Sequence, residues 1–240
     1  MNNLILPTDV RHNIEDVIEE FQRADVLRNH GVEPRNRVLF TGPPGNGKTT
    51  LAETIAEALG FPLYVVQYDG LVGSFLGETS ERLRQLFDFA NKAPGVFFFD
   101  EFDTIGKERG DNHEVGEIKR VVSTLLMQID SLSSDAIIVV ASNHPELLDR
   151  AVWRRFQLHV DLPKPDQGAI QTWLKRFEID ANFNWPDTTD NIAEKLHGLS
   201  FAEIEHFAFD VYRPYILSLS DTTLHTLFDR SLKRAQARLR

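Results

Sequence analysis

Short apolar runs alternate with helical patterns along most of the chain. Between the runs, apolar residues recur at spacings of three and four, as in Leu83, Leu86, Phe87 and Ala90, which is typical of an amphipathic helix. The runs themselves are candidate buried strands and lie at residues 38–40, 63–66, 96–99, 137–141 and 156–160. Continuously apolar strands that alternate with helices predict an α/β fold, in which a parallel sheet is covered by helices on both faces.

The pattern changes after Leu162-Pro163, where the apolar runs of strand type end. Ser200 followed by Glu203 fits a capping box that opens one of the later helices. An amphipathic helix is also predicted at 13–29, ahead of the first strand. The helical stretches of the last part are predicted near 166–178, 188–196, 201–217 and 221–237. The predicted organisation is an N-terminal linker and helix at 1–36, a large α/β domain at 37–162 and a small helical lid domain at 163–240.

The composition narrows the classes of protein. The chain has 240 residues, with 26 Lys and Arg against 36 Asp and Glu, and this net charge of −10 argues against nucleic acid as a partner. Its apolar runs are far shorter than the about 20 residues that span a bilayer, and the N-terminus lacks the features of a secretory signal. The absence of cysteine excludes disulfides, thiolate metal sites and cysteine nucleophiles. We therefore expect a cytoplasmic protein without a membrane segment.

The most specific motif matches G-x-x-x-x-G-K-[ST] at residues 42–49, after a predicted strand and before a predicted helix. Its glycines allow backbone N–H groups to close around phosphate oxygens, while the Lys48 ammonium reaches the β- and γ-phosphates. The Thr49 hydroxyl is expected to bind Mg²⁺. The sequence thus predicts ATP and Mg²⁺ as cofactors. The predicted nucleotide-binding residues here are Gly42, Pro43, Pro44, Gly45, Asn46, Gly47, Lys48, Thr49 and Thr50.

A second motif, Asp100-Glu101, directly follows the apolar run 96–99. A carboxylate at the end of a buried strand suits Asp100 as a residue that binds the nucleotide's hydrated Mg²⁺, and the adjacent Glu101 can polarise the attacking water. The other interpretation is a charged pair at the point where the strand leaves the core. Asp103 fits a helix cap or a structural ion pair as well as a direct part in the chemistry.

These two motifs, together with Ala141-Ser142-Asn143-His144-Pro145 and the segment 148–156, resemble the AAA+ ATPase family in its AAA subgroup. The resemblance covers essentially the whole chain, which looks most like stand-alone bacterial AAA ATPases. It implies a P-loop NTPase sandwich with a five-stranded sheet in the order 5-1-4-3-2, and a helical lid over the nucleotide. It also implies hydrolysis of ATP to ADP and phosphate in a ring, usually a hexamer, with ATP at the subunit boundaries.

The resemblance assigns further residues. Asn143 matches sensor 1, which positions water and reads the γ-phosphate, although it also suits the start of the Asn-His-Pro turn. Arg154 and Arg155 match the paired arginines that reach into the neighbouring site, in an arrangement similar to katanin and spastin; the alternative is two solvated arginines before an edge strand. Ala202 lies in a segment that matches a small-residue lid motif, in which Phe201 replaces an expected glycine.

Phe75-Leu76-Gly77 resembles the first pore loop of the family, which grips an extended polypeptide. The alternative is that Phe75 packs into the core of its own subunit. The charged loop 106–113 either lines the same channel or is simply solvated. Asp130-Ser131-Leu132 stands where many relatives have Asp-Gly-Phe, so coupling between subunits is expected to differ in detail.

Three functions follow from these observations. The first is a ring that uses ATP binding and hydrolysis to remodel, unfold or thread a protein substrate. The second is a nucleotide-controlled switch or scaffold that regulates a separate partner protein, such as a protease in a bacterial defence system. The third is a DNA-acting motor, for which the one supporting feature is the basic C-terminal tail. Because only 36 residues precede the first strand, we expect that recruitment of a substrate belongs to another protein or to a segment removed from this chain.

Overall fold

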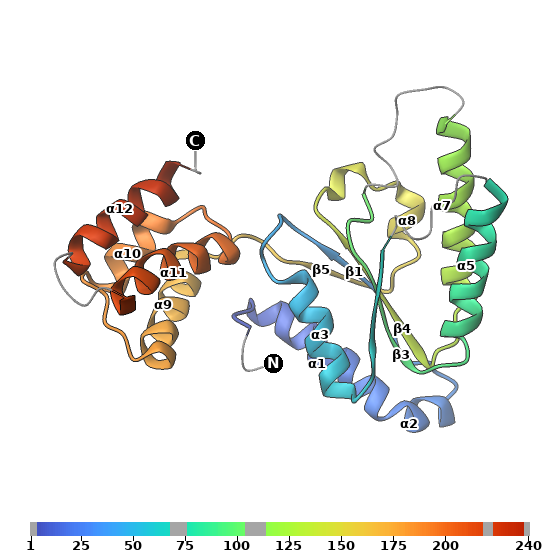
Figure 1. The fold of residues 1–240 in the computed structure, drawn as a ribbon. Helices are drawn as coiled ribbons and strands as arrows, with labels where there is room; N and C mark the ends of the chain where they lie inside the picture. Colours follow the sequence, from blue (N-terminus) through green and yellow to red (C-terminus); the bar gives the residue numbers. More distant parts are fainter. Residues whose placement is uncertain (1–3, 68–75, 104–113, 218–222, 238–240) are drawn as a thin grey trace. The chain divides into compact units, whose positions relative to one another are not determined.

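The computed structural model describes residues 4–67, 76–103, 114–217 and 223–237, without the side chains of 76–77 and 114–121 (Figure 1). The chain forms two compact units. The first consists of the residues up to Gly42 together with Lys48–Leu162, and the second consists of Pro43–Gly47 together with the residues from Pro163 onward.

The first unit contains a five-stranded sheet in the order β2-β3-β4-β1-β5, in which every pair is parallel. This order confirms the predicted 5-1-4-3-2. The strands are β1 Arg37–Thr41, β2 Leu63–Val66, β3 Gly95–Phe99, β4 Ala136–Ser142 and β5 Leu158–Asp161. The last strand begins two residues later than predicted, because Phe156 packs in the core without joining the sheet.

Helices cover both faces of this sheet, as Figure 1 shows for α1 and α3 on one side and α5 and α7 on the other. Val38 and Phe40 of β1 face the first pair, whereas Leu39 faces the second pair, which explains why the run is apolar without alternation. The predicted helix 13–29 is two helices, because the backbone leaves the helical region at Arg23. The helical elements of this unit are α1 Thr8–Gln22, α2 Ala24–Asn29, α3 Lys48–Leu59, α5 Leu76–Ala90, α7 Glu114–Asp130, the 3₁₀ turn η1 Pro145–Leu147 and α8 Arg150–Trp153.

The second unit is helical and has its own core, to which Trp185 and Phe207 contribute stacked rings. Its α11 opens with the predicted capping box, which is confirmed. The Ser200 N–H donates to Glu203 Oε2 at 2.8 Å, and the Glu203 N–H donates to Ser200 Oγ at 3.4 Å. The helices are α9 Gln167–Ala181, α10 Thr189–Leu196, α11 Phe201–Leu217 and α12 Leu224–Ala237.

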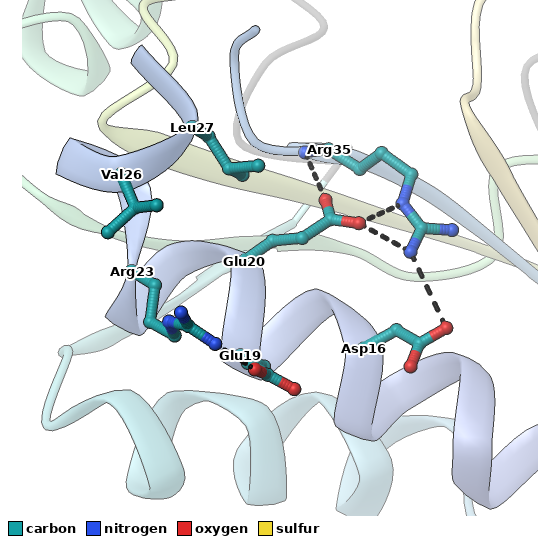
Figure 2. Close-up of a pocket in the computed structure, with 7 residues that line it drawn as sticks. All are labelled: Asp16, Glu19, Glu20, Arg23, Val26, Leu27 and Arg35. Carbon is teal, nitrogen blue, oxygen red and sulfur yellow. Dashed lines mark hydrogen bonds and ion pairs between the residues drawn. The ribbon is translucent and has the colours of Figure 1, made fainter. Parts of the chain in front are cut away.

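A cavity of about 290 Å³ lies between α1, α2 and Arg35 in the first unit (Figure 2). Glu20 accepts hydrogen bonds from Arg35 Nε at 2.7 Å and from the Arg35 backbone N–H at 2.8 Å. The same guanidinium lies 3.8 Å from Asp16. Because these charges pair with one another, we assign the cluster a structural role: it ties α1 to the segment that enters β1.

Candidate nucleotide-binding site

Three neighbouring strands end at the same edge of the sheet. Thr41 at the end of β1 pairs with Ser142 at the end of β4, and Phe99 at the end of β3 pairs with Val140 of β4. Consequently the phosphate loop after β1, Asn143 after β4 and Asp100 after β3 come from adjacent strands at one edge. In open parallel sheets, ligands bind outside the carboxyl ends of the strands. The structure therefore brings three of the predicted motifs to the place where a ligand is expected.

Lys48 opens α3 and is almost fully buried, with 6% of its surface exposed. Its Nζ donates a hydrogen bond to the Gly42 carbonyl at 2.6 Å. Burial lowers the pKa of Lys48, and the negative charges of Asp100, Asp103 and Asp161 oppose that shift. The ammonium thus lies at the mouth of the phosphate loop, close to the carboxylate that the sequence assigns to Mg²⁺.

Asp161 was not predicted as part of the site. It ends β5, the strand next to β1, and accepts a hydrogen bond from Thr41 Oγ1 at 3.0 Å. The signal that identifies Asp161 is the one that identified Asp100, namely a carboxylate at the end of a buried strand. The strand order is needed as well, because this carboxylate reaches the site only when β5 lies beside β1.

Two glycines of the phosphate loop have no room for a side chain. A Cβ on Gly42, at φ +126°, would lie 2.2 Å from the carbonyl oxygen of Leu162. A Cβ on Gly45, at φ +77°, would lie 2.9 Å from Cβ of Ala202. An L side chain at either position would therefore distort the loop.

The loop also contacts the start of α11 within the second unit. The N–H of Ala202 donates to the Gly45 carbonyl at 3.0 Å, and the N–H of Phe201 donates to Asn46 Oδ1 at 3.3 Å. Ala202, which the resemblance places in the lid, therefore lies against the phosphate loop. Phe201 keeps its backbone contact although it replaces the expected glycine. The remaining residues that the motif assigns are Pro43 and Pro44 in the turn, Gly47 before the helix, and Thr49 and Thr50, which are exposed in the first turn of α3.

Glu101 has a backbone conformation that is rare for its residue type. Its φ is +50°, in the left-handed region, and its N–H donates to Asp100 Oδ1 at 2.8 Å. Such a conformation costs about 1–3 kcal/mol for a residue other than glycine and clusters at functional sites. The turn after β3 leaves the Glu101 side chain exposed at the edge of the sheet.

Asp103 is buried and bonds to the end of the neighbouring strand. Its Oδ1 accepts hydrogen bonds from Ser142 Oγ at 3.0 Å and from the Asn143 N–H at 3.1 Å, while the Phe102 N–H donates to the Ala141 carbonyl at 2.9 Å. These bonds join the segment after β3 to the segment after β4. Of the roles that the sequence left open, the geometry supports a structural one: Asp103 fixes the backbone of Asn143 relative to that of Glu101.

The paired arginines lie away from the phosphate loop of their own chain. Arg155 Nε is 2.9 Å from Asp130 Oδ2, and Asp130 Oδ1 is 3.5 Å from Nη1 of Arg37, the first residue of β1. The phosphate loop follows the other end of β1, about 13 Å away at about 3.3 Å per residue. Arg154 is exposed beside Arg155. The structure does not bring these arginines to the phosphate loop of the same chain.

The predicted pore loop is not tested by the structure. Phe75 and the charged loop 106–113 lie outside the described residues, and Leu76 and Gly77 are the first two residues of α5. The assignment of this loop stays a prediction.

Comparison with known sequences decides the family. The sequence profile of the ATPase family associated with various cellular activities (AAA) matches residues 38–164, which include the phosphate loop, Asp100-Glu101, Asn143 and both arginines. The chain belongs to the AAA family of ATPases. As an AAA ATPase it binds and hydrolyses ATP. Among the described helices of this ATPase, none has the length and apolar character needed to cross a membrane.

Individual relatives are similar over most of this chain. The AAA family ATPase y4kL of Sinorhizobium fredii is 38% identical over 234 residues, which are 97% of this chain and 70% of the relative. The proteasome-activating nucleotidase of Methanopyrus kandleri is 32% identical over 80% of this chain and 46% of its own length. The cell division cycle protein 48 homolog of Archaeoglobus fulgidus is 33% identical over 75% of this chain and 25% of its own. The chain therefore spans less than half the length of the last two.

Proposed function

We propose that this AAA ATPase assembles into a ring, a hexamer as is usual in the family, and uses ATP hydrolysis to remodel a protein substrate. The observation that carries the proposal is the placement of Arg154 and Arg155 away from the phosphate loop of their own chain. A second copy of the chain supplies these arginines if it docks with this surface against the first copy's site. An arginine that acts in trans raises the rate of phosphoryl transfer by about 10³–10⁵ in systems of this chemistry.

Within one subunit, the residues divide into phosphate binding and water activation. The backbone N–H groups of the loop and Lys48 would hold the phosphates, and the hydroxyl of Thr49 and the carboxylate of Asp100 would hold Mg²⁺. This donor set fits the metal, because Mg²⁺ in proteins keeps several waters and takes one or two carboxylates plus phosphate oxygens. When bound, Mg²⁺ neutralises charge on the β- and γ-phosphate oxygens.

Hydrolysis needs a base and an oriented water. Glu101 accepts the proton of the attacking water, and its exposed position at the edge of the sheet leaves it open to that water. The Asn143 amide orients the same water and contacts the γ-phosphate. Asp103 accepts a hydrogen bond from the Asn143 backbone N–H, which holds the start of this segment next to the turn that carries Glu101. The arginine of the neighbouring subunit stabilises the charge that develops during transfer.

The names of two relatives, a proteasome-activating nucleotidase and a cell division cycle protein 48 homolog, support a role directed at proteins. In the proposed ring, Phe75 grips an extended polypeptide in the central channel, and ATP turnover moves it.

The gripping role of Phe75 is tested by its replacement with alanine. We expect Phe75→Ala to keep basal ATPase activity within about threefold, which is about 0.7 kcal/mol in the barrier. The same variant should lose the unfolding of a green fluorescent protein that carries an unstructured tail, measured as fluorescence decay. Phe89→Ala, at a partly exposed phenylalanine of α5, is the matched control and should keep unfolding activity.

Two results would contradict this role. If Phe75 is a core residue, its loss costs about 3–5 kcal/mol and the melting temperature falls strongly, so the pore-loop assignment is wrong. If Phe75→Ala melts normally and still unfolds the tailed protein, threading is wrong and a nucleotide-controlled switch is favoured.

A further inference from the structure

The two paired arginines have different surroundings. Arg155 Nε donates to Asp130 Oδ2 at 2.9 Å, and its Nη1 donates to the Ala151 carbonyl at 2.9 Å. Its side chain is 30% exposed. Arg154 is exposed, and its side chain forms no ion pair or hydrogen bond with another residue of the described part of the chain. Arg155 is therefore tied to its own subunit by two hydrogen bonds, whereas the Arg154 guanidinium has none to break among the described residues.

Asp130 is held from two directions. Besides the bond to Arg155, its Oδ1 lies 3.5 Å from Nη1 of Arg37. Asp130 ends α7, Arg37 begins β1 and Arg155 follows α8, so one carboxylate joins three elements that are distant in the sequence. The hydrogen bond from Arg155 is charge-assisted, a kind about twice as strong as a neutral one, and the Arg37 guanidinium faces the other carboxylate oxygen.

If the Arg155 side chain extends away from its own subunit toward the phosphates of a neighbour, it loses the hydrogen bonds that its Nε and Nη1 make to Asp130 and Ala151. It also leaves Asp130 with only the more distant Arg37. Arg154 has no hydrogen bond or ion pair of this kind to break among the described residues. Since Arg155 precedes the core residue Phe156, its two bonds also fix the backbone next to Arg154 and limit the directions in which Arg154 points.

We propose that Asp130 is a positioning residue that keeps Arg155 on its own subunit, so that Arg154 alone is presented to the phosphates of the neighbouring subunit. This assignment rests on the proposed function, in which the arginines act in trans. Asp130 would thus affect the subunit boundary by holding Arg155, and would not contact the nucleotide itself.

The test uses mixtures of two inactive proteins. The acceptor carries Arg154→Ala and Arg155→Ala and keeps its phosphate loop, whereas the donor carries Lys48→Ala and keeps its arginines. ATPase activity that appears on mixing measures arginines supplied by the donor to the acceptor. Further changes are then made on the donor only or on the acceptor only, and each protein is checked by thermal melting.

When Arg154→Ala is added to the donor, the ATPase activity restored by mixing should fall at least about 100-fold. Arg155→Ala and Asp130→Asn should each reduce it about tenfold, and the two together no more than either alone, because both break the same charged hydrogen bond. Asp130→Glu, which keeps the carboxylate, should restore most of the activity. On the acceptor, Asp130→Asn should have no effect, whereas a loss of fold would lower activity from either side.

The outcomes separate the two proposals. If the unmodified donor and acceptor restore no activity, the proposed shared site is wrong, and the role of Asp130 is overturned with it. If they do restore activity but Arg155→Ala on the donor is the more severe change, or Asp130→Asn acts equally from both sides or from neither, the role of Asp130 alone is wrong.

Discussion

Lys48→Ala should abolish ATP binding. The Lys48 ammonium is buried and donates to the Gly42 carbonyl; in the proposed function its charge offsets that of the β- and γ-phosphates, and alanine supplies neither charge nor donor. We expect the dissociation constant for ATP, measured by isothermal titration calorimetry, to rise at least about 100-fold, as for the loss of a buried charge-assisted contact.

The control for this variant is Lys92→Ala, at an exposed lysine that follows α5. It makes the same change of residue type and should bind ATP as the unmodified protein does. Since Lys48 also donates to the Gly42 carbonyl, a melting curve must show that the variant is folded. A folded Lys48→Ala protein that binds ATP within threefold of the unmodified protein would contradict the assignment.

Glu101→Gln should keep ATP binding and lose hydrolysis. The amide has nearly the shape of the carboxylate but cannot accept a proton from water, so the base is lost and the phosphate contacts remain. General-base catalysis contributes about 10²–10⁴ to the rate, and we expect kcat to fall by that factor in a phosphate-release assay. Glu57→Gln, at an exposed glutamate of α3, should leave kcat unchanged. Comparable turnover in the Glu101 variant would remove this residue from catalysis.

The Lys48 and Glu101 variants together distinguish separate catalytic steps from a shared structural role. If Lys48 and Glu101 acted only by holding the fold together, both changes would lower binding and turnover in parallel with the melting temperature. Distinct losses, of binding in one variant and of hydrolysis in the other, follow only when the two side chains act at different steps.

The sequence predicted the features that depend on residues close together in the chain, namely the short motifs and the buried strands. The phosphate loop and Asp100-Glu101 each occupy a few consecutive positions, and the strands at their flanks are continuously apolar because both faces of the sheet are covered. The errors lie at element ends. Phe156 is apolar because it packs in the core, although it precedes β5, and the change of backbone direction at Arg23 left no break in the apolar pattern.

The contacts between distant segments could not be predicted in the same way. Asp161 lies next to Thr41 at the end of β1 because β5 pairs with β1, and Asp103 reaches Asn143 because β3 pairs with β4. Asp130 meets Arg155 across 25 residues of sequence, and the sequence distinguishes Asp130 only as the first residue of Asp130-Ser131-Leu132, a segment whose last two residues depart from Asp-Gly-Phe. These partners follow from the strand order and the register of the sheet, which the apolar runs alone do not specify.

In the proposed function, one ATP site is built from two copies of this chain. The most direct measurement is the ATPase activity of an equimolar mixture of Lys48→Ala protein and Arg154→Ala/Arg155→Ala protein, each inactive alone. Because some boundaries then pair an intact phosphate loop with intact arginines, we expect mixing to restore part of the activity, and this activity to rise more than linearly with total protein concentration. If the folded proteins stay inactive on mixing, or if the double arginine variant hydrolyses ATP by itself at the normal rate, the shared site is contradicted.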